Sequence, residues 1–555
     1  MLTPVQFVLL IVISIILLSF LPVASSSKIR LFTRKNGAFI VTAMIVALLG
    51  AYPYEQGFFL GQEYEDAYVY TEYSRYLLYN QDFTVNPLQT KGCVLGSLNN
   101  CLMEATYGGH LLVLSSIGYF VSKYADYTPS VLCMINLLVS LASIFLVYSA
   151  SHVLSGDRRI SMVCSLLYAT TPAMSLFHTS GLSETLSSAT VLFTFLLYLV
   201  LVEKPDGLEK RAKPVLWIIL ILVFSLSLLQ KRENLILAFM PFITVAKMML
   251  LGQWERDKAK RMAVFATIVV LTVLAYHYWI DVSNIEKQEG LDINNVTFSL
   301  EYFFSLAPVF VRSFFTYKWF FLFSVVALAG MAMLPFTFRT NPLYIYPTML
   351  FTAYFLAYTM HYRSYYHVKY GDVNEYEALR YITNFFPFYC LMAGYAVSQI
   401  LRVFGMKIEK VKIPVIVLSV ILIIYLIHAN VILRSEFHKS EQEGRIVPVN
   451  ETLRHIDQAT NAVITDIPLV FQVYASESLV LIDLPSLRTS TNRSVTADMI
   501  RSGKSIYYLK HVTGLENRSR ERWPEAMAFL DSLQLEEMKG YSARGYELYR
   551  VRGVR

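Results

Sequence analysis

The stretch Gly61 to Asn86, GQEYEDAYVYTEYSRYLLYNQDFTVN, differs in character from most of this 555-residue chain. Much of the surrounding sequence is apolar enough to lie in a bilayer, whereas this stretch opens with Glu63, Glu65 and Asp66 and continues as a tyrosine-rich helix. Neighbouring carboxylates beside a membrane cost free energy unless they hold a metal, a proton or a polar substrate. This stretch alone is compatible with two interpretations, a functional site and an ordinary solvated acidic loop.

The composition predicts a polytopic membrane protein. The chain is 55% hydrophobic and 16% charged, with a mean hydropathy of +0.45, whereas soluble domains carry about 25% charged residues. Its net charge of +7 arises from lysines and arginines that cluster in short segments between apolar spans. That distribution follows the positive-inside rule, so we expect a membrane and no nucleic-acid partner.

The order of apolar spans and basic loops predicts the domain organisation. Spans of about 20 residues cross a bilayer, and counting them gives about twelve crossings with basic loops on the inner side. We therefore expect a transmembrane domain over residues 1–430, with an external loop at 55–127. Three further external loops are predicted at 178–187, 281–317 and 361–380.

The C-terminal part has the character of a soluble domain. We expect a small α/β domain over residues 431–555, and the predicted topology places it on the extracytoplasmic face. Its expected strands lie at 463–466, 478–483, 505–509 and 547–551, and its expected helices at 449–459 and 522–533.

The five cysteines separate into two groups. Cys133, Cys164 and Cys390 fall inside apolar spans, so we expect them to be inert core residues. Cys93 and Cys101 share one predicted external loop and would form a disulfide if that loop faces an oxidising exterior; two free thiols are the alternative. No spacing of cysteine and histidine predicts a zinc site.

In the opening stretch, a carboxylate and two tyrosines are predicted to share one helical face. Asp66, Tyr70 and Tyr73 follow the spacing i, i+4, i+7 and therefore lie together. A carboxylate held beside a wall of tyrosines can take the proton of an acceptor hydroxyl, which makes Asp66 the candidate base and Tyr70 and Tyr73 candidate substrate-binding residues. Glu65 and Asp66 can also bind a divalent cation through their oxygens.

The pattern EDAYVYTEYSRYLLYNQDFTVN resembles the first external loop of the GT-C membrane glycosyltransferases that use polyprenyl-phosphate sugars. This group includes the protein O-mannosyl, lipid A aminoarabinose and arabinofuranosyl transferases. Residues 65–68, EDAY, correspond to the acidic start of that loop, and residues 73–75, YSR, to its step of tyrosine, small residue and arginine. The chain departs from the pattern at Glu65, where glutamate replaces the usual first aspartate and keeps a carboxylate.

Three later segments are also similar to this superfamily. HTSGLSETLSS at 178–188 would supply a second external acidic residue, Glu184. LLQKRENLIL at 228–237 would bring Lys231 and Arg232 to a lipid phosphate, and ALRYITNFFPFYCLMAG at 378–394 would bring Arg380. Each has a structural alternative: Glu184 as a helix cap, Lys231 and Arg232 in an interfacial salt bridge, and Arg380 snorkelling at a helix end.

The resemblance implies an inverting glycosyltransferase of the cell membrane. It would move a sugar from a polyprenyl-phosphate donor to a lipid-, glycan- or protein-linked acceptor on the extracytoplasmic face. Asp66 would be the catalytic base, and Arg380, Arg232 and Lys231 would bind the donor phosphate. No nucleotide cofactor is expected, because the sequence contains no Gly-rich phosphate loop.

The resemblance leaves the metal open, because some relatives use one and others do not. A divalent Mg²⁺, Mn²⁺ or Ca²⁺ would be held by Glu65, Asp66 and Glu184. Two other functions also remain at this point. A secondary transporter of about twelve helices is disfavoured by the absence of a sequence repeat, and an inactive GT-C-like assembly subunit would accommodate the glutamate at position 65.

Overall fold

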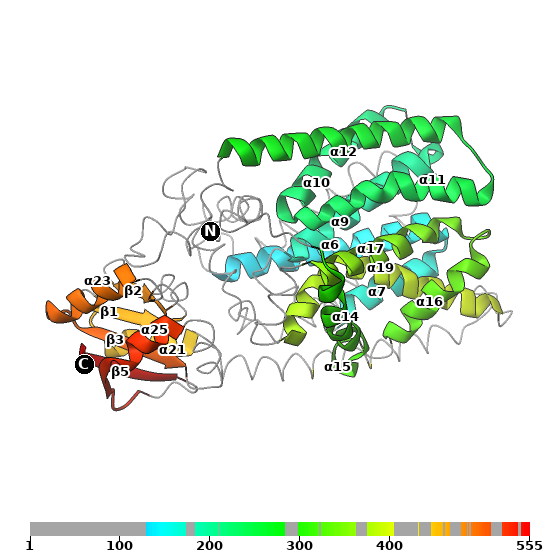
Figure 1. Cartoon of the computed structure of the whole chain (residues 1–555). Coiled ribbons are helices and arrows are strands. Elements are labelled where there is room, and N and C mark those ends of the chain that lie inside the picture. Colours follow the sequence, from blue (N-terminus) through cyan, green and yellow to red (C-terminus); the bar gives the residue numbers. More distant parts are fainter. Residues whose placement is uncertain are drawn as a thin grey trace, which may run out of the picture. The chain divides into compact units, whose positions relative to one another are not determined.

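The structure is a computed structural model, and its described residues form two compact units (Figure 1). A helical unit includes residues 133–279 and 293–403, and a second unit includes residues 446–554. The described residues are 129–171, 173, 184–208, 210–283, 298–320, 323–361, 374–403, 424, 431, 446–458, 461–466, 479–484, 487, 490–511, 524–541 and 546–554.

Apolar runs of the sequence form the long helices of the helical unit. Among the described residues, three segments are long and apolar enough to cross a membrane: Ile135–Ser155, Glu184–Glu203 and Glu233–Leu251. The count of about twelve crossings concerns the whole chain and stays a prediction. The helices are α6 (Pro129–Ser155), α7 (Arg158–Thr170), α9 (Glu184–Tyr198), the π-helical η5 (Leu199–Glu203), η6 (Pro205–Gly207), α10 (Ala212–Gln230), the 3₁₀-helical η7 (Arg232–Phe239), α11 (Met240–Leu251), α12 (Arg256–Ser283), α14 (Leu300–Phe315), α15 (Tyr317–Phe320), α16 (Phe323–Thr337), η9 (Pro342–Tyr344), α17 (Ile345–Met360) and α19 (Asn374–Val403).

Helix α19 lies at the centre of the helical unit. It packs against α7, α9, α14, α16 and α17, and its side chains from Ala378 to Ala396 are buried. Two glycines allow its neighbours to approach closely. A Cβ at Gly330 of α16 would overlap the carbonyl oxygen of Met392, and a Cβ at Gly394 would overlap Sγ of Cys164 on α7. A side chain at Gly330 would therefore push against the backbone of α19, whereas one at Gly394 would displace the side chain of Cys164.

Three predicted external loops prove to be partly helical. The predicted loop 281–317 contains α14, whose first turn is capped by Ser299 Oγ accepting from the backbone N–H of Glu301 (3.1 Å). Helix α9 already begins at Glu184, and α19 begins at Asn374. The predictions followed apolar runs and therefore missed the polar first turns of α9 and α19, whereas the apolar α14 was missed because the expected topology placed residues 281–317 in a loop. Glu184 and Arg380 consequently lie on helices, not on loops.

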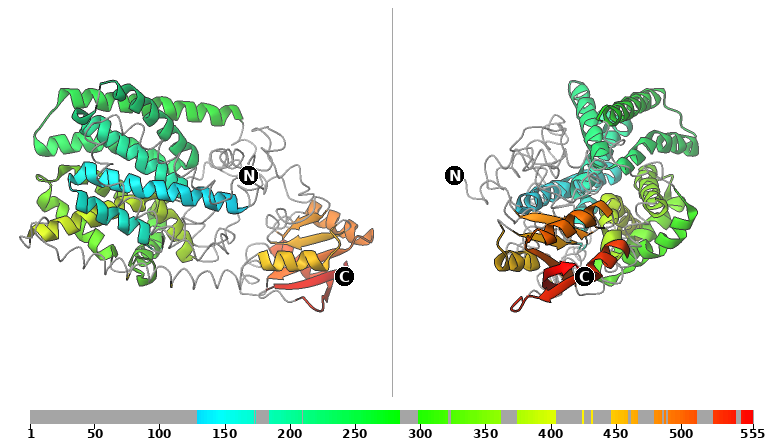
Figure 2. Two further views of the ribbon diagram at one scale, coloured as in Figure 1. Left: turned by 180° about the vertical axis from the view of Figure 1, so that it is seen from behind. Right: turned by 60° about the vertical axis from the view of Figure 1, so that its left-hand side comes forward.

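The second unit is a five-stranded mixed sheet with the order β2-β1-β3-β5-β4. Strand β1 runs parallel to β2 and β3, whereas β5 runs antiparallel to β3 and β4. Helix α21 covers one face, and α23 and α25 pack against the other (Figure 2). The elements are α21 (Ile446–His455), β1 (Ala462–Thr465), β2 (Val480–Asp483), α23 (Ser490–Arg501), β3 (Ile506–His511), α25 (Pro524–Asp531), β4 (Leu533–Glu537) and β5 (Tyr546–Val554).

The four predicted strands are confirmed within a few residues, as are the helices at α21 and α25. Two elements were missed. Strand β4 buries only Leu533, so no apolar alternation reveals this edge strand. Helix α23 buries only Thr496 and Ala497.

A buried tyrosine links the end of this unit to its first helix. The hydroxyl of Tyr541 donates to the carbonyl oxygen of Pro448 in α21 (3.0 Å), and burial raises the pKa of Tyr541 to about 12.

Candidate functional site

Three segments that the sequence singled out meet at the carboxylate of Glu184. Nζ of Lys231 lies 2.9 Å from Glu184 Oε1, and Nε of Arg380 lies 2.6 Å from the same oxygen. The side chains of Glu184, Lys231 and Arg380 are 1%, 7% and 11% exposed, respectively. We call these three residues the Glu184 cluster. Two cations share one carboxylate away from solvent, so the cluster carries one net positive charge.

Local structure explains how each member reaches the cluster. Glu184 is the first residue of α9, where the helix dipole favours a negative charge. Lys231 has an extended backbone (φ −147°, ψ 125°) between α10 and η7, and its ammonium lies 5.5 Å from the ring centre of Tyr381. Arg380 lies near the start of α19. Isolated charges at such positions would be costly, and mutual pairing offsets that cost.

One oxygen of the cluster remains open to a ligand. Oε2 of Glu184 is buried and forms no hydrogen bond to any residue of the described ranges. Buried polar atoms normally have a partner. Oε2 is therefore an acceptor for a bound molecule or for a group from outside the described residues.

A second polar layer lies one helical turn from the Glu184 cluster. Ser187 Oγ donates to Asn384 Oδ1 (2.6 Å), Asn384 Nδ2 donates to Asn234 Oδ1 (2.9 Å), and Asn234 Nδ2 donates to Ser187 Oγ (2.9 Å). All three side chains are fully buried. The hydroxyl of Tyr354 donates to Asn234 Oδ1 (3.1 Å), and Asn384 Nδ2 also donates to the hydroxyl of Tyr358 (3.0 Å). We call Ser187, Asn234 and Asn384 the Ser–Asn–Asn ring.

Sequence reasoning did not find this ring. Its members are uncharged, and serine and asparagine occur often enough in helices to pass without notice. The available signal was their spacing, because each follows a member of the Glu184 cluster by three or four residues within an apolar span. Polar side chains inside membrane segments usually face other polar groups.

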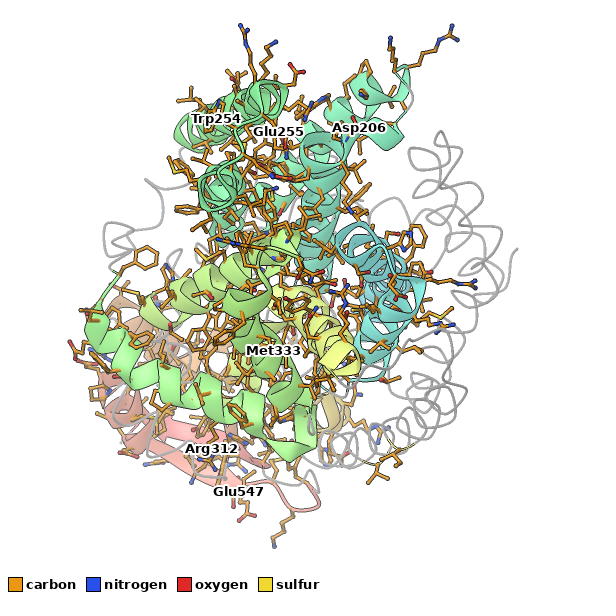
Figure 3. All side chains as sticks on the ribbon, turned by 90° about the vertical axis from the view of Figure 1, so that its right-hand side faces the viewer. Asp206, Trp254, Glu255, Arg312, Met333 and Glu547 are labelled. Carbon is orange, nitrogen blue, oxygen red and sulfur yellow. The ribbon has the colours of Figure 1, made fainter. Side chains whose placement is uncertain are left out.

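A separate ionic cluster occupies the other end of the same span. Glu203 pairs with Lys247 and with Lys258 (3.4 Å), and Lys258 also lies 2.8 Å from Glu255. Tyr346 donates to Glu203. Figure 3 labels Glu255 on the turn between α11 and α12. The segment Glu184–Glu203 has 20 residues, so its two glutamates are separated by about 30 Å, close to the thickness of a hydrocarbon core.

The structure does not show the remaining predicted site residues in contact with the Glu184 cluster. Arg232 begins η7, but its side chain is not among those described. In the described ranges, no group of three or more histidine, cysteine, aspartate or glutamate side chains is arranged to hold a metal ion. Cys164 and Cys390 are buried and free, as predicted. The following residues lie outside the described part of the chain, and their roles stay predictions: Glu65, Asp66, Tyr70, Tyr73, Cys93 and Cys101.

A polytopic helical unit followed by a small α/β unit is the architecture of the GT-C membrane glycosyltransferases. The comparison with solved structures supports this fold over most of the chain. The structure of ArnT from Cupriavidus metallidurans bound to undecaprenyl phosphate is similar with a TM-score of 0.57 and 12% identity, covering 93% of this chain and 98% of that one.

Archaeal oligosaccharyltransferase structures are similar to a comparable degree. AglB from Archaeoglobus fulgidus, in complex with an inhibitory peptide and a dolichol-phosphate, gives a TM-score of 0.51 at 12% identity over 93% of this chain and 74% of that one. The same enzyme tethered with an acceptor peptide gives a TM-score of 0.52 at 11% identity. Neither a protein-family model nor a curated protein sequence matches the chain. The GT-C fold expected from the sequence is confirmed, and identities this low establish the fold alone.

Proposed function

We propose that this protein is an inverting glycosyltransferase that moves a sugar from a polyprenyl-phosphate donor to an acceptor on the extracytoplasmic face of the membrane. The observation that carries this proposal is the Glu184 cluster within a GT-C fold. Its excess positive charge is buried where three helical segments meet, and ArnT, which shares the fold, was captured with undecaprenyl phosphate.

The donor phosphate would bind to Arg380 and Lys231. An arginine presents several donors in a planar fork that matches phosphate oxygens, and a lysine adds a point charge. Glu184 holds both cations in place before the donor arrives, and the net charge of the cluster still attracts an anion. Arg232 would add a second arginine beside Lys231. The prenyl tail would lie along the apolar outer surface of the helices.

The transfer would be a single displacement. The acceptor oxygen attacks the anomeric carbon, and the bond from that carbon to the phosphate oxygen breaks. Asp66 takes the acceptor proton, and the lipid phosphate leaves with the bonding electrons. Attack opposite the leaving phosphate inverts the anomeric centre. Tyr70 and Tyr73 would line the sugar or acceptor.

A bound divalent metal stays a prediction, and it has no role in the displacement described above. Of its three predicted ligands, only Glu184 belongs to the described residues. Two cations already lie on Oε1 of Glu184, and their charges oppose a third cation, so this position suits an anion better. A metal would therefore depend mainly on Glu65 and Asp66.

Substitution of the proposed base tests the function directly. We expect Asp66→Asn to abolish sugar transfer in the purified protein supplied with a polyprenyl-phosphate sugar, while undecaprenyl phosphate still binds and the unfolding temperature stays unchanged. Asp206→Asn, at an exposed aspartate, is the matched control and should transfer sugar normally.

Two outcomes would contradict the proposal. Wild-type transfer by Asp66→Asn would remove Asp66 as the base. Solute flux through the wild-type protein in liposomes that contain no lipid-linked sugar, together with no transfer, would instead support a transporter.

A further inference from the structure

We propose that the Ser–Asn–Asn ring positions the Glu184 cluster, holding Lys231 and Arg380 at the angle at which they bind an anion. The anion would be the donor phosphate, and this part of the inference rests on the function proposed above. The positioning role itself concerns only the geometry of Lys231 and Arg380.

The spacing of the two layers links them residue by residue. Ser187 follows Glu184 by three residues on α9, and Asn384 follows Arg380 by four on α19, so each pair shares a helix face. Asn234 follows Lys231 by three residues at the start of η7, and a 3₁₀-helix has three residues per turn. Helices α9 and α19 therefore each carry one member of the Glu184 cluster and one member of the ring, one turn apart. Lys231 directly precedes η7, and the backbone N–H of Asn234 donates to the carbonyl oxygen of Lys231 (3.0 Å).

Asn234 also controls where Lys231 leaves α10. Its Nδ2 donates to the carbonyl oxygen of Ser227 (2.8 Å), which belongs to the last turn of α10. The same carbonyl accepts the backbone N–H of Lys231 (3.1 Å). The last carbonyls of a helix have no partner within the helix, so Asn234 and Lys231 together satisfy this one. Loss of the amide at position 234 would release the junction that directs the Lys231 side chain.

The two layers differ in how strictly they define geometry. Coulomb attraction falls slowly with distance and has little angular dependence, so the Glu184 cluster alone tolerates rotation of its helices. Hydrogen bonds weaken steeply when distance or angle departs from the optimum. The ring is closed, with its three members each donating to the next, so rotation of any one element breaks two bonds. The ring consequently fixes the orientations that the ion pairs leave free.

Amine footprinting tests this role without using the enzyme's activity. Lys231 of the detergent-purified full chain is exposed to an acylating reagent, and its modification rate is followed by mass spectrometry. Asn384→Leu removes the ring amide and keeps a similar volume. Thr383→Val is the matched control, because Thr383 is buried beside Asn384 and its hydroxyl donates only within α19, to the carbonyl oxygen of Leu379 (3.0 Å).

We expect the wild type and Thr383→Val to protect Lys231 equally. In Asn384→Leu, Lys231 should react about tenfold faster or more at a temperature where the variant is folded, because loss of a buried hydrogen bond shifts a local equilibrium by about this factor. The Kd for undecaprenyl phosphate should rise about tenfold to a hundredfold in the same variant for the same reason. Ser187→Ala, which deletes one atom and opens the ring, should shift both quantities in the same direction and serves if Asn384→Leu does not fold.

The outcomes separate this inference from the proposed function. Protection of Lys231 in folded Asn384→Leu or Ser187→Ala equal to that in Thr383→Val would overturn the positioning role. Faster modification of Lys231 in the ring variants, with no binding of undecaprenyl phosphate by the wild type, would support the positioning role and refute the phosphate site.

Discussion

Replacement of Glu184 by glutamine is the sharpest test of the candidate site. The substitution keeps the size of the side chain and one acceptor oxygen but removes the charge that faces Lys231 and Arg380. Both cations then lose a carboxylate oxygen at 2.9 Å and 2.6 Å, within side chains that are 7% and 11% exposed.

The expected cost follows from burial. Removal of one partner of a buried ion pair costs about 3–5 kcal/mol, a large part of a total stability of about 5–15 kcal/mol. The amide of glutamine still accepts one hydrogen bond, so we expect about 3 kcal/mol for Glu184→Gln. At about 2–4 °C per kcal/mol for units of 150–250 residues, this lowers the unfolding temperature by about 6–12 °C. Asp257→Asn is the control, because Asp257 is 79% exposed and 3.4 Å from Lys260, and such pairs contribute about 0–1 kcal/mol.

Thermal unfolding can be followed with a thiol-reactive fluorophore, since Cys164 and Cys390 are free and buried in the folded protein. A second variant carries Glu184→Gln together with Lys231→Met, which removes the ammonium left without its carboxylate. It should be more stable than Glu184→Gln alone, with a coupling of about 1–3 kcal/mol. An unfolding temperature of Glu184→Gln equal to that of the wild type would refute the reasoning, as would strict additivity in the double variant.

Three further predictions concern separate parts of the chain. Arg380→Lys keeps the charge but loses the planar fork, so the Kd for undecaprenyl phosphate should rise about tenfold; an unchanged Kd would exclude Arg380 from the phosphate site. Gly394→Ala should destabilise the protein by about 1–3 kcal/mol through overlap with Cys164, and added Cys164→Ala should recover most of that loss in a circular dichroism melt, whereas no recovery would show that the strain lies elsewhere. Cys93 and Cys101 should both resist alkylation until a reductant is added; modification without reductant would show free thiols.

The sequence predicted the members of the Glu184 cluster but not their pairing with one another. Charged side chains at the ends of apolar spans are rare because they are costly, so Glu184, Lys231 and Arg380 could be singled out one at a time. Their contacts join residues that are 47 and 196 positions apart, and no local pattern encodes such a distance. The alternatives of a helix cap and a salt bridge were each partly correct: Glu184 begins a helix and pairs with Lys231. Arg380 turns inward to Glu184, which differs from the snorkelling alternative.

The missed elements had two different causes. The first turns of α9 and α19 and strand β4 are polar, so their existence depends on packing partners from distant segments. Helix α14 is apolar, and the expected topology had placed its residues in an external loop. The 3₁₀ geometry of η7 has no signature in RENLILAF, which reads as an ordinary apolar helix. That geometry matters for the proposed function, because its first turn brings the backbone N–H of Asn234 to the carbonyl oxygen of Lys231 (3.0 Å).

The two ends of the span Glu184–Glu203 explain why the phosphate is assigned to one of them. At both ends a glutamate of the span faces a lysine of the neighbouring segment, Lys231 at one end and Lys247 at the other. A slip of one helical turn, about 5.4 Å, would break both pairs at once, so together they fix the axial register of the span. Among the described residues, the two ends differ in charge balance. At the Glu203 end, Lys247 and Lys258 face two carboxylates, Glu203 and Glu255, and the pairs neutralise one another. At the Glu184 end, the ion pairs within the described residues join two cations to a single carboxylate, whose second oxygen accepts no hydrogen bond from those residues. An anionic donor with hydroxyl groups would balance the excess of cations among these described ion pairs and would supply a hydrogen-bond donor to Oε2.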